Sequence, residues 1–176
     1  MVYNPRTRHS SRFMISLRTV KALLVASVGA WAALVAYGNL ADYGANWAFV
    51  QHVLAMDTVF QDNPLKSRAV TDPAVQRIAY WSIIATEWAM AAACFYGAWR
   101  LFRARADRRA FIAAKVPAVV ALALVFLLYY IGFIAIGGEW FAMWQSSTWN
   151  GQQSAFRFLT CAMLVMIVVL VPEEDA

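Results

Sequence analysis

Four long apolar segments dominate this chain and limit what it can fold into. We place them at about residues 19–41, 75–101, 116–136 and 154–171. Each is close to the roughly 20 residues that an α-helix needs to cross the hydrocarbon core of a bilayer. Charged residues make up only 14% of the chain, well below the roughly 25% of a typical soluble domain. The sequence therefore predicts an all-α membrane protein, built as a four-transmembrane-helix bundle.

Lysine and arginine are spread unevenly between the ends of these segments, and such an asymmetry orients a membrane protein. The region through Lys21 carries five of them, and the link from Arg100 to Lys115 carries six. The long connection through Arg77 carries three, and the stretch before the last segment carries one, Arg157. We therefore expect an N-in/C-in topology, with the two longer connections on the outer side.

This topology divides the chain into three parts. Residues 1–18 form a basic cytoplasmic tail that we expect to lack fixed structure, residues 19–171 form the membrane domain, and residues 172–176 form an acidic cytoplasmic end. The alternative for the first segment is a cleaved signal peptide, because Ala36-Tyr37-Gly38 loosely resembles a cleavage site. The basic residues flank apolar segments, so the net charge of +5 indicates a lipid bilayer and no nucleic acid as partner.

Two Trp-rich segments link the apolar segments on the expected outer side. In the first, Trp47, Val50 and Leu54 recur at helical spacing. The second, GGEWFAMWQSSTWNGQQSAFRF, covers residues 137–158. Written as a helix, it places on one face Trp140, Met143, Trp144 and Ser147. Because tryptophan prefers the membrane–water interface, we expect each segment to hold a short interfacial helix.

These Trp-rich segments also resemble one another. Each begins with glycine, has tryptophan three residues later and reaches glutamine soon after. This weak similarity suggests two helical hairpins, each crowned by an interfacial helix. The outer face is either an ordinary aromatic belt or a polar-lined surface that binds something at the outer leaflet. The candidate interaction residues on it are Trp47, Gln51, His52, Glu139, Trp140, Trp144, Asn150 and Arg157.

Glu87 is the strongest single candidate for a functional residue. It lies near the middle of the second apolar segment, where a carboxylate is costly and usually faces protein or a water-filled cavity. One hypothesis makes it a proton relay, an ion site or a ligand anchor, and the other a carboxyl that only fixes helix packing. The candidate partners at similar depth are Tyr129, Tyr130 and Thr160.

His52 is the only histidine outside the tail. As a helix pair, His52 and Met56 would share a face, which allows a haem as a minor alternative. The main interpretation is a hydrogen-bonded interfacial histidine, so we expect neither a metal nor a cofactor. Cys94 and Cys161 both fall inside apolar segments at different depths, and we expect two unpaired, buried side chains.

Glu139 and Arg157 flank the second Trp-rich segment at the outer ends of neighbouring apolar segments. If the third and fourth helices are antiparallel neighbours, a Glu139–Arg157 ion pair could close the connection between them. Asp42, at the outer end of the first segment, is a competing partner for Arg157.

Three of these motifs together resemble a bacterial family of predicted small integral membrane proteins of unknown function. They are NWAFVQHVLAMDT, Glu87 followed by the pair Gly97-Ala98, and the segment from Gly137 to Phe158. The resemblance extends from about Tyr43 to Phe158. It implies four membrane helices and a multi-pass protein of the bacterial inner membrane, and it implies no activity, substrate or cofactor.

No serine–histidine–aspartate set, nucleophile elbow or phosphate loop occurs in the sequence, so we do not expect an enzyme. The leading hypothesis is an accessory or scaffold subunit that docks a membrane partner through its aromatic outer face. The alternative is a small transporter, or a binder of a lipid or quinone-like ligand, that uses Glu87 and Tyr130. Four helices are few for a transporter, so that alternative would require a homo-oligomer.

Overall fold

The computed structural model describes the backbone of residues 6–173 and the side chains of residues 17–173. This part of the chain contains helices and no strand. In chain order the elements are α1 (Arg6–Ala41), α2 (Tyr43–Ala55), η1 (Pro64–Arg68), α3 (Pro73–Ala104), α4 (Arg108–Leu127), η2 (Leu128–Trp140), η3 (Met143–Gln145) and α5 (Gln152–Leu170). Two of them, η1 and η3, are short 3₁₀ helices, and η2 is a π-helix.

Four helical stretches are long and apolar enough to cross a membrane. They are Leu17–Ala41, Pro73–Ala104, Arg108–Trp140 and Gln152–Leu170, the third being formed by α4 and η2 together. The prediction of an all-α chain with four apolar helices is confirmed.

Two helices begin earlier than the sequence predicted. The expected unstructured tail through Arg18 is wrong for the described residues, since α1 begins at Arg6. No glycine or proline lies between Pro5 and Gly29, so no residue in that stretch interrupts the helix. Most of the basic link after Arg100 is also helical, because the Asp107 carboxylate accepts a hydrogen bond from the amide of Ala110 and caps α4. Residues 174–176 of the predicted acidic end lie outside the described residues.

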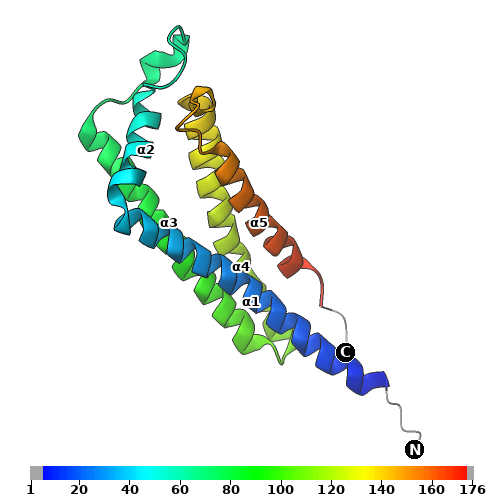
Figure 1. Ribbon diagram of the computed structural model, residues 1–176. Helices are drawn as coiled ribbons and strands as arrows, with labels where there is room; N and C mark the ends of the chain where they lie inside the picture. Colours follow the sequence, from blue (N-terminus) through cyan, green and yellow to red (C-terminus); the bar gives the residue numbers. More distant parts are fainter. Residues whose placement is uncertain (1–5, 174–176) are drawn as a thin grey trace, which may run out of the picture.

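The helices pack in the order α1, α3, α4 and α5 (Figure 1). Small residues let neighbouring backbones approach closely. A Cβ atom at Gly97 of α3 would lie 2.7 Å from the Cα of Ala118 in α4, and one at Gly29 of α1 would lie 3.0 Å from the Cβ of Cys94. Cys94 is buried and Cys161 exposed, both as free thiols, so the expectation of burial is wrong for Cys161.

The two ends of the bundle differ in how closely the helices approach. We call the end where α1 begins and α5 ends the terminal end, and the opposite one the loop end. Figure 1 shows α2 and the start of α3 on one side of the loop end, and the end of η2 with the start of α5 on the other. The main apolar core lies between α1, α3, α4 and α5, around Met90, Leu101, Phe111 and Leu122.

The two connections at the loop end are docked on each other. Gln145 Oε1 accepts hydrogen bonds from the Phe60 amide at 3.0 Å and from Asn63 Nδ2 at 2.9 Å. Thr58 Oγ1 donates to Ser146 Oγ at 2.9 Å. Gln145 and Ser146 therefore tie the second Trp-rich segment to the connection between α2 and α3.

The predicted helix in the first Trp-rich segment is α2, and that prediction is confirmed. In the second segment it is wrong, because only the three residues of η3 are helical between the end of η2 and the start of α5. Ala142 adopts a left-handed conformation, with φ 51°, which breaks the helix. Met143 is buried while Trp140 and Trp144 are half-exposed, so these side chains do not share one face. The two segments fold differently, and the structure gives no support to a repeat.

Candidate functional site

Glu87 lies near the middle of α3 and is buried, with 2% of its surface exposed. Asn39, near the end of α1, donates a hydrogen bond from Nδ2 to Glu87 Oε2 at 2.6 Å. Among the described residues no donor reaches the other carboxylate oxygen, Oε1. Buried carboxylates are usually paired with a cation or surrounded by donors. Glu87 therefore has an unused acceptor on a costly group.

Asn39 is itself held in place by α3. Tyr80, which precedes Glu87 in α3, is buried and donates a hydrogen bond from its hydroxyl to the backbone oxygen of Asn39 at 2.8 Å. This bond links the last turn of α1 to α3 and fixes the backbone that carries the amide. Neither Asn39 nor Tyr80 was predicted from the sequence as a functional residue. Asn39 is the one amide in the first apolar segment, and that polar residue in an apolar context was the available signal.

Glu87 lines a cavity of about 450 Å³ at the loop end, between α1, α2, α3, η2 and α5. Its wall is partly aromatic and partly polar, and no lysine, arginine or histidine contributes to it. The aromatic residues are Phe49, Tyr80, Tyr129, Phe133, Trp149 and Phe158, and the polar ones, apart from Glu87, are Asn39, Asn46, Thr148, Asn150 and Ser154. The cavity thus combines one carboxylate, several neutral hydrogen-bonding groups and broad aromatic surfaces.

Tyr129, and not Tyr130, is the η2 tyrosine of this cavity. Tyr129 is 3% exposed, while Tyr130 is 45% exposed and stacks on Phe126 away from the lining. In the π-helix, Tyr129 and Phe133 lie on the same face with their rings 5.4 Å apart. Of the two tyrosines predicted as partners of Glu87, Tyr129 therefore lines the cavity and Tyr130 does not. A tyrosine pair in an apolar segment does not reveal which member faces inwards, and a π-helix shifts the face further.

Thr160 is also outside the cavity. Its hydroxyl donates to the backbone oxygen of Phe156 in its own helix at 2.6 Å, a common way for threonine to satisfy itself within a helix. The predicted partnership between Glu87 and Thr160 is therefore wrong.

Trp149 and Phe49 roof the cavity at the loop end. Trp149 stacks on His52 of α2, with ring centroids 4.6 Å apart and an angle of 14° between the ring planes. Phe49 lies over Gly151, where a Cβ would meet its ring at 2.8 Å. Only glycine allows this approach. Asn150, one of the predicted interaction residues, lines the cavity and accepts a hydrogen bond from the amide of Gln152.

A second cavity, of about 220 Å³, lies further along the same face of α2, towards the C-terminus of that helix, and is almost wholly apolar. The two cavities share Phe49, Val50, Ile83 and Phe133 in their walls. These four side chains therefore form a thin apolar partition between a polar and an apolar space.

His52 makes two contacts besides lining a shallow hollow with Gln51 and Asp57. Its Nδ1 lies 2.8 Å from Asp57 Oδ2, and its ring stacks on Trp149. Met56 follows the end of α2 in a left-handed conformation and is buried, so the helix pairing of His52 with Met56 is wrong. Among the described side chains, no group of three or more histidine, cysteine, aspartate or glutamate residues could hold a metal ion.

The predicted ion pair between Glu139 and Arg157 is not formed among the described residues. Both side chains are exposed. The inward face of α5 carries Ala155 and Leu159, so Arg157, between them in sequence, points away from η2. Nor does Asp42 pair with Arg157.

The remaining predicted residues form aromatic contacts at the loop end. Arg68 lies over the ring of Trp140 at 4.3 Å and donates to its backbone oxygen. Trp144 meets Phe60 edge-on with centroids 6.0 Å apart. Trp47 packs against Tyr80, and so touches the cavity wall only from outside.

Four apolar helices, a buried intramembrane carboxylate and an aromatic cavity define a small polytopic integral membrane protein. The chain belongs to the family described as predicted small integral membrane protein (DUF2165), whose family model matches residues 17–172. Comparisons with curated proteins and with solved structures gave no match to the chain.

Proposed function

We propose that this protein is a non-enzymatic membrane protein that binds a small organic cation in the cavity around Glu87, either to retain it or to move it across the bilayer. One observation carries the proposal. A buried carboxylate lines a cavity of about 450 Å³ and receives one hydrogen bond, from Asn39, among the described residues.

The composition of the cavity wall supports a cationic ligand. A positive charge in a bound ligand would pair with Glu87, and no cationic side chain in the wall competes for it. Aromatic ring faces attract cations as well, and Tyr129, Phe133 and Trp149 supply such faces. The volume falls within the range of about 300–1,000 Å³ that is usual for small-molecule sites.

A neutral lipid or quinone-like ligand is the competing occupant. The carbonyl groups of a quinone are acceptors, and they would need donors in the wall. The amide beside Glu87, Asn39 Nδ2, is already engaged with Glu87 Oε2, so the donors left for a quinone carbonyl lie elsewhere in the wall, at groups such as Asn150 and Ser154. The free acceptor at Oε1 instead favours a ligand that brings a positive charge or an N–H group.

Binding of benzyltrimethylammonium, a permanently charged aromatic cation, tests this proposal directly. Equilibrium dialysis against the detergent-solubilised protein should detect saturable binding, and Glu87→Gln should weaken it about tenfold or more, equivalent to about 1.4 kcal/mol. Glutamine keeps the shape of the side chain and removes its charge.

The matched control is Glu139→Gln, which removes the same charge from an exposed side chain at the loop end and should leave binding unchanged. Equal affinity for the cation in wild type and Glu87→Gln contradicts the proposal. Saturable binding of a short-chain benzoquinone, with none of the cation, transfers the site to the neutral ligand.

A role as an accessory subunit is the second candidate. It is supported by half-exposed Phe60, Trp140 and Trp144 at the loop end, although an aromatic belt at the membrane interface accounts for such residues too. If a polypeptide co-purifies in mild detergent, Trp140→Ala and Trp144→Ala should release it. Trp99→Ala, an equally exposed tryptophan of α3, should not. An intact complex in both loop-end variants removes this candidate.

We also propose a bacterial inner-membrane location, and the charge asymmetry of the sequence supports an orientation with both termini in the cytoplasm. The loop end would then face the periplasm. Ser147, an exposed serine of the second Trp-rich segment, offers a labelling position. In intact cells, a Ser147→Cys variant should react with a membrane-impermeant thiol reagent added outside, and protection there would reverse the topology.

A further inference from the structure

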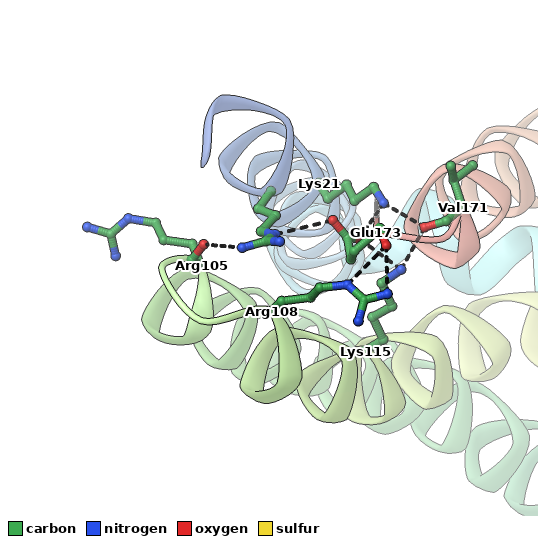
Figure 2. Close-up of polar contacts among 7 residues, drawn as sticks. Lys21, Arg105, Arg108, Lys115, Val171 and Glu173 are labelled. Atoms are coloured by element: carbon green, nitrogen blue, oxygen red, sulfur yellow. Dashed lines mark hydrogen bonds and ion pairs between the residues drawn. The ribbon is translucent and has the colours of Figure 1, made fainter. Parts of the chain in front are cut away.

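Cationic side chains from α1 and α4 converge on the last described residues of the chain at the terminal end (Figure 2). Lys21 Nζ and Lys115 Nζ lie 2.6 and 2.9 Å from Glu173 Oε1, and Arg18 Nε lies 3.3 Å from Oε2. Arg108 donates from Nε and Nη2 to the backbone oxygen of Glu173, at 3.1 and 3.0 Å. We call Arg18, Lys21, Arg108 and Lys115 the cation cluster, and residues 171–173 the C-terminal strap.

Burial makes the cation cluster unusual. Arg18, Lys21 and Lys115 are all buried, and the Glu173 side chain is only 3% exposed. Buried charges normally find opposite charges or several hydrogen bonds. Here, among the described side chains, Glu173 is the one carboxylate in contact with these three cations. Backbone oxygens supply the remaining acceptors, and Val171 O takes both lysines at 2.8 and 2.7 Å.

The depth of the cluster matches the lipid headgroup region. Arg18 directly precedes the first apolar segment, at about residues 19–41, and Glu173 lies just beyond the end of the span Gln152–Leu170. Both positions are at the boundary between apolar and aqueous surroundings. Basic pockets between membrane helices at this boundary are typical binding sites for the phosphate of anionic lipids.

We propose that the cation cluster is a site for the phosphate of an anionic lipid headgroup, and that the C-terminal strap occupies it in this structure with the Glu173 carboxylate in the place of the phosphate. A phosphate diester presents the same charged oxygen acceptors as a carboxylate and pairs with the same lysine and arginine donors. The strap is covalently attached and therefore present at high effective concentration. A lipid displaces it only where anionic lipid is abundant, so the state of the strap reports the lipid composition.

The wild-type protein itself tests this exchange. The full chain is placed in lipid nanodiscs of phosphatidylcholine alone or with phosphatidylglycerol, and exposed carboxylates are labelled with a carbodiimide and an amine. Peptide mass spectrometry should find Glu173 protected in phosphatidylcholine and labelled several-fold more in phosphatidylglycerol. Labelling of the exposed Glu139 should stay constant. Equal protection of Glu173 in both lipids overturns the proposal.

Two variants then locate the lipid. Glu173→Gln should retain more phosphatidylglycerol per chain than wild type in native mass spectrometry, and adding Lys115→Gln should remove that gain. Equal retention of phosphatidylglycerol with and without the Lys115→Gln change overturns the proposed location. Inorganic phosphate added to phosphatidylcholine nanodiscs should leave Glu173 protected. Deprotection by inorganic phosphate alone would assign the cluster to a free anion and overturn the lipid headgroup.

Discussion

At the terminal end, Glu173 meets two lysines and an arginine, whereas Glu87, within the bundle towards the loop end, meets a single amide. Both carboxylates are buried. The first is fully engaged by the protein and draws α1, α4 and the C-terminal strap together. The second keeps an unused oxygen beside a cavity. A buried carboxylate therefore holds structural elements together at Glu173, whereas at Glu87 it keeps an oxygen free to bind a ligand.

Packing around the two carboxylates follows the same division. Small residues bring α3 and α4 into close contact at Gly97 and Ala118, on the side of Glu87 that leads to the terminal end. On the other side, α2 and the bulky rings of Phe49 and Phe133 separate α3 from α5 and leave two cavities. An end that is closed by charges can hold the helices together while the other end stays hollow.

Removing the Glu173 carboxylate at the terminal end should have the largest effect on stability. Glu173→Ala leaves Arg18, Lys21 and Lys115 without their shared partner, and breaking a buried ion pair by deleting one member costs about 3–5 kcal/mol. We expect a large fall in the midpoint of thermal unfolding in detergent. Glu139→Ala, the exposed control, should change the unfolding free energy by less than about 0.5 kcal/mol. Similar stabilities of the two variants would contradict the conclusion that Glu173 holds the terminal end together.

The pH dependence of stability isolates the charged part of that effect. Burial alone would raise the pKa of Glu173, but hydrogen bonds and charges from Lys21 and Lys115 outweigh it and lower the pKa below its ordinary value of 4.5. A lowered pKa in the folded state means that the stabilisation is complete above the unfolded pKa and is lost as pH falls through the folded one.

The measurement compares wild type with Glu173→Ala from pH 7 down to pH 3. Their difference in unfolding free energy should be constant at the upper end and should shrink below about pH 4.5, the ordinary value. A difference that stays constant across the whole range would assign the effect of Glu173 to packing instead of charge.

Removing the charge of Glu87, beside the cavity at the loop end, should change stability only slightly. Glu87→Gln keeps an oxygen that can accept from Asn39 and removes a buried charge, so unfolding free energy should change by no more than about 1 kcal/mol. Asn39→Ala should cost more, about 1–3 kcal/mol, because it leaves a buried carboxylate without its donor. Thermal unfolding of both variants checks the order, and a larger loss in Glu87→Gln would make Glu87 a structural residue.

Much of this architecture follows from the sequence, since four apolar helices and a costly carboxylate at Glu87 depend only on local composition. The partners of Glu87 do not. Tyr129 and Tyr130 were both predicted as partners, and only Tyr129 lines the cavity, because the chain changes from α- to π-helix at Leu128 and the face of each side chain changes with it. Asn39 lies in another helix than Glu87, and no local sequence pattern links the two residues. Their hydrogen bond depends on how α1 packs against α3.

Glu173 is the clearest residue that the sequence could not assign. In a short acidic end, a glutamate is normally solvated, and nothing local distinguishes it from its neighbours. Its burial depends on Lys21 and Lys115, which are far apart in sequence and meet only after α1 and α4 pack. Long-range charge convergence of this kind is a property of the assembled bundle.

The smallest effect on stability should come from His52, which contacts the roof of the cavity at the loop end. The pair of His52 with Asp57 is partly exposed, with His52 at 37%, and such pairs contribute about 0–1 kcal/mol. His52→Ala should therefore reduce the unfolding free energy by no more than about 1 kcal/mol, and Gln51→Ala, its neighbour in α2, is the control. His52 also holds Trp149 over the cavity through ring stacking. Benzyltrimethylammonium should consequently dissociate faster from His52→Ala than from Gln51→Ala, and equal rates would remove Trp149 from the role of a roof.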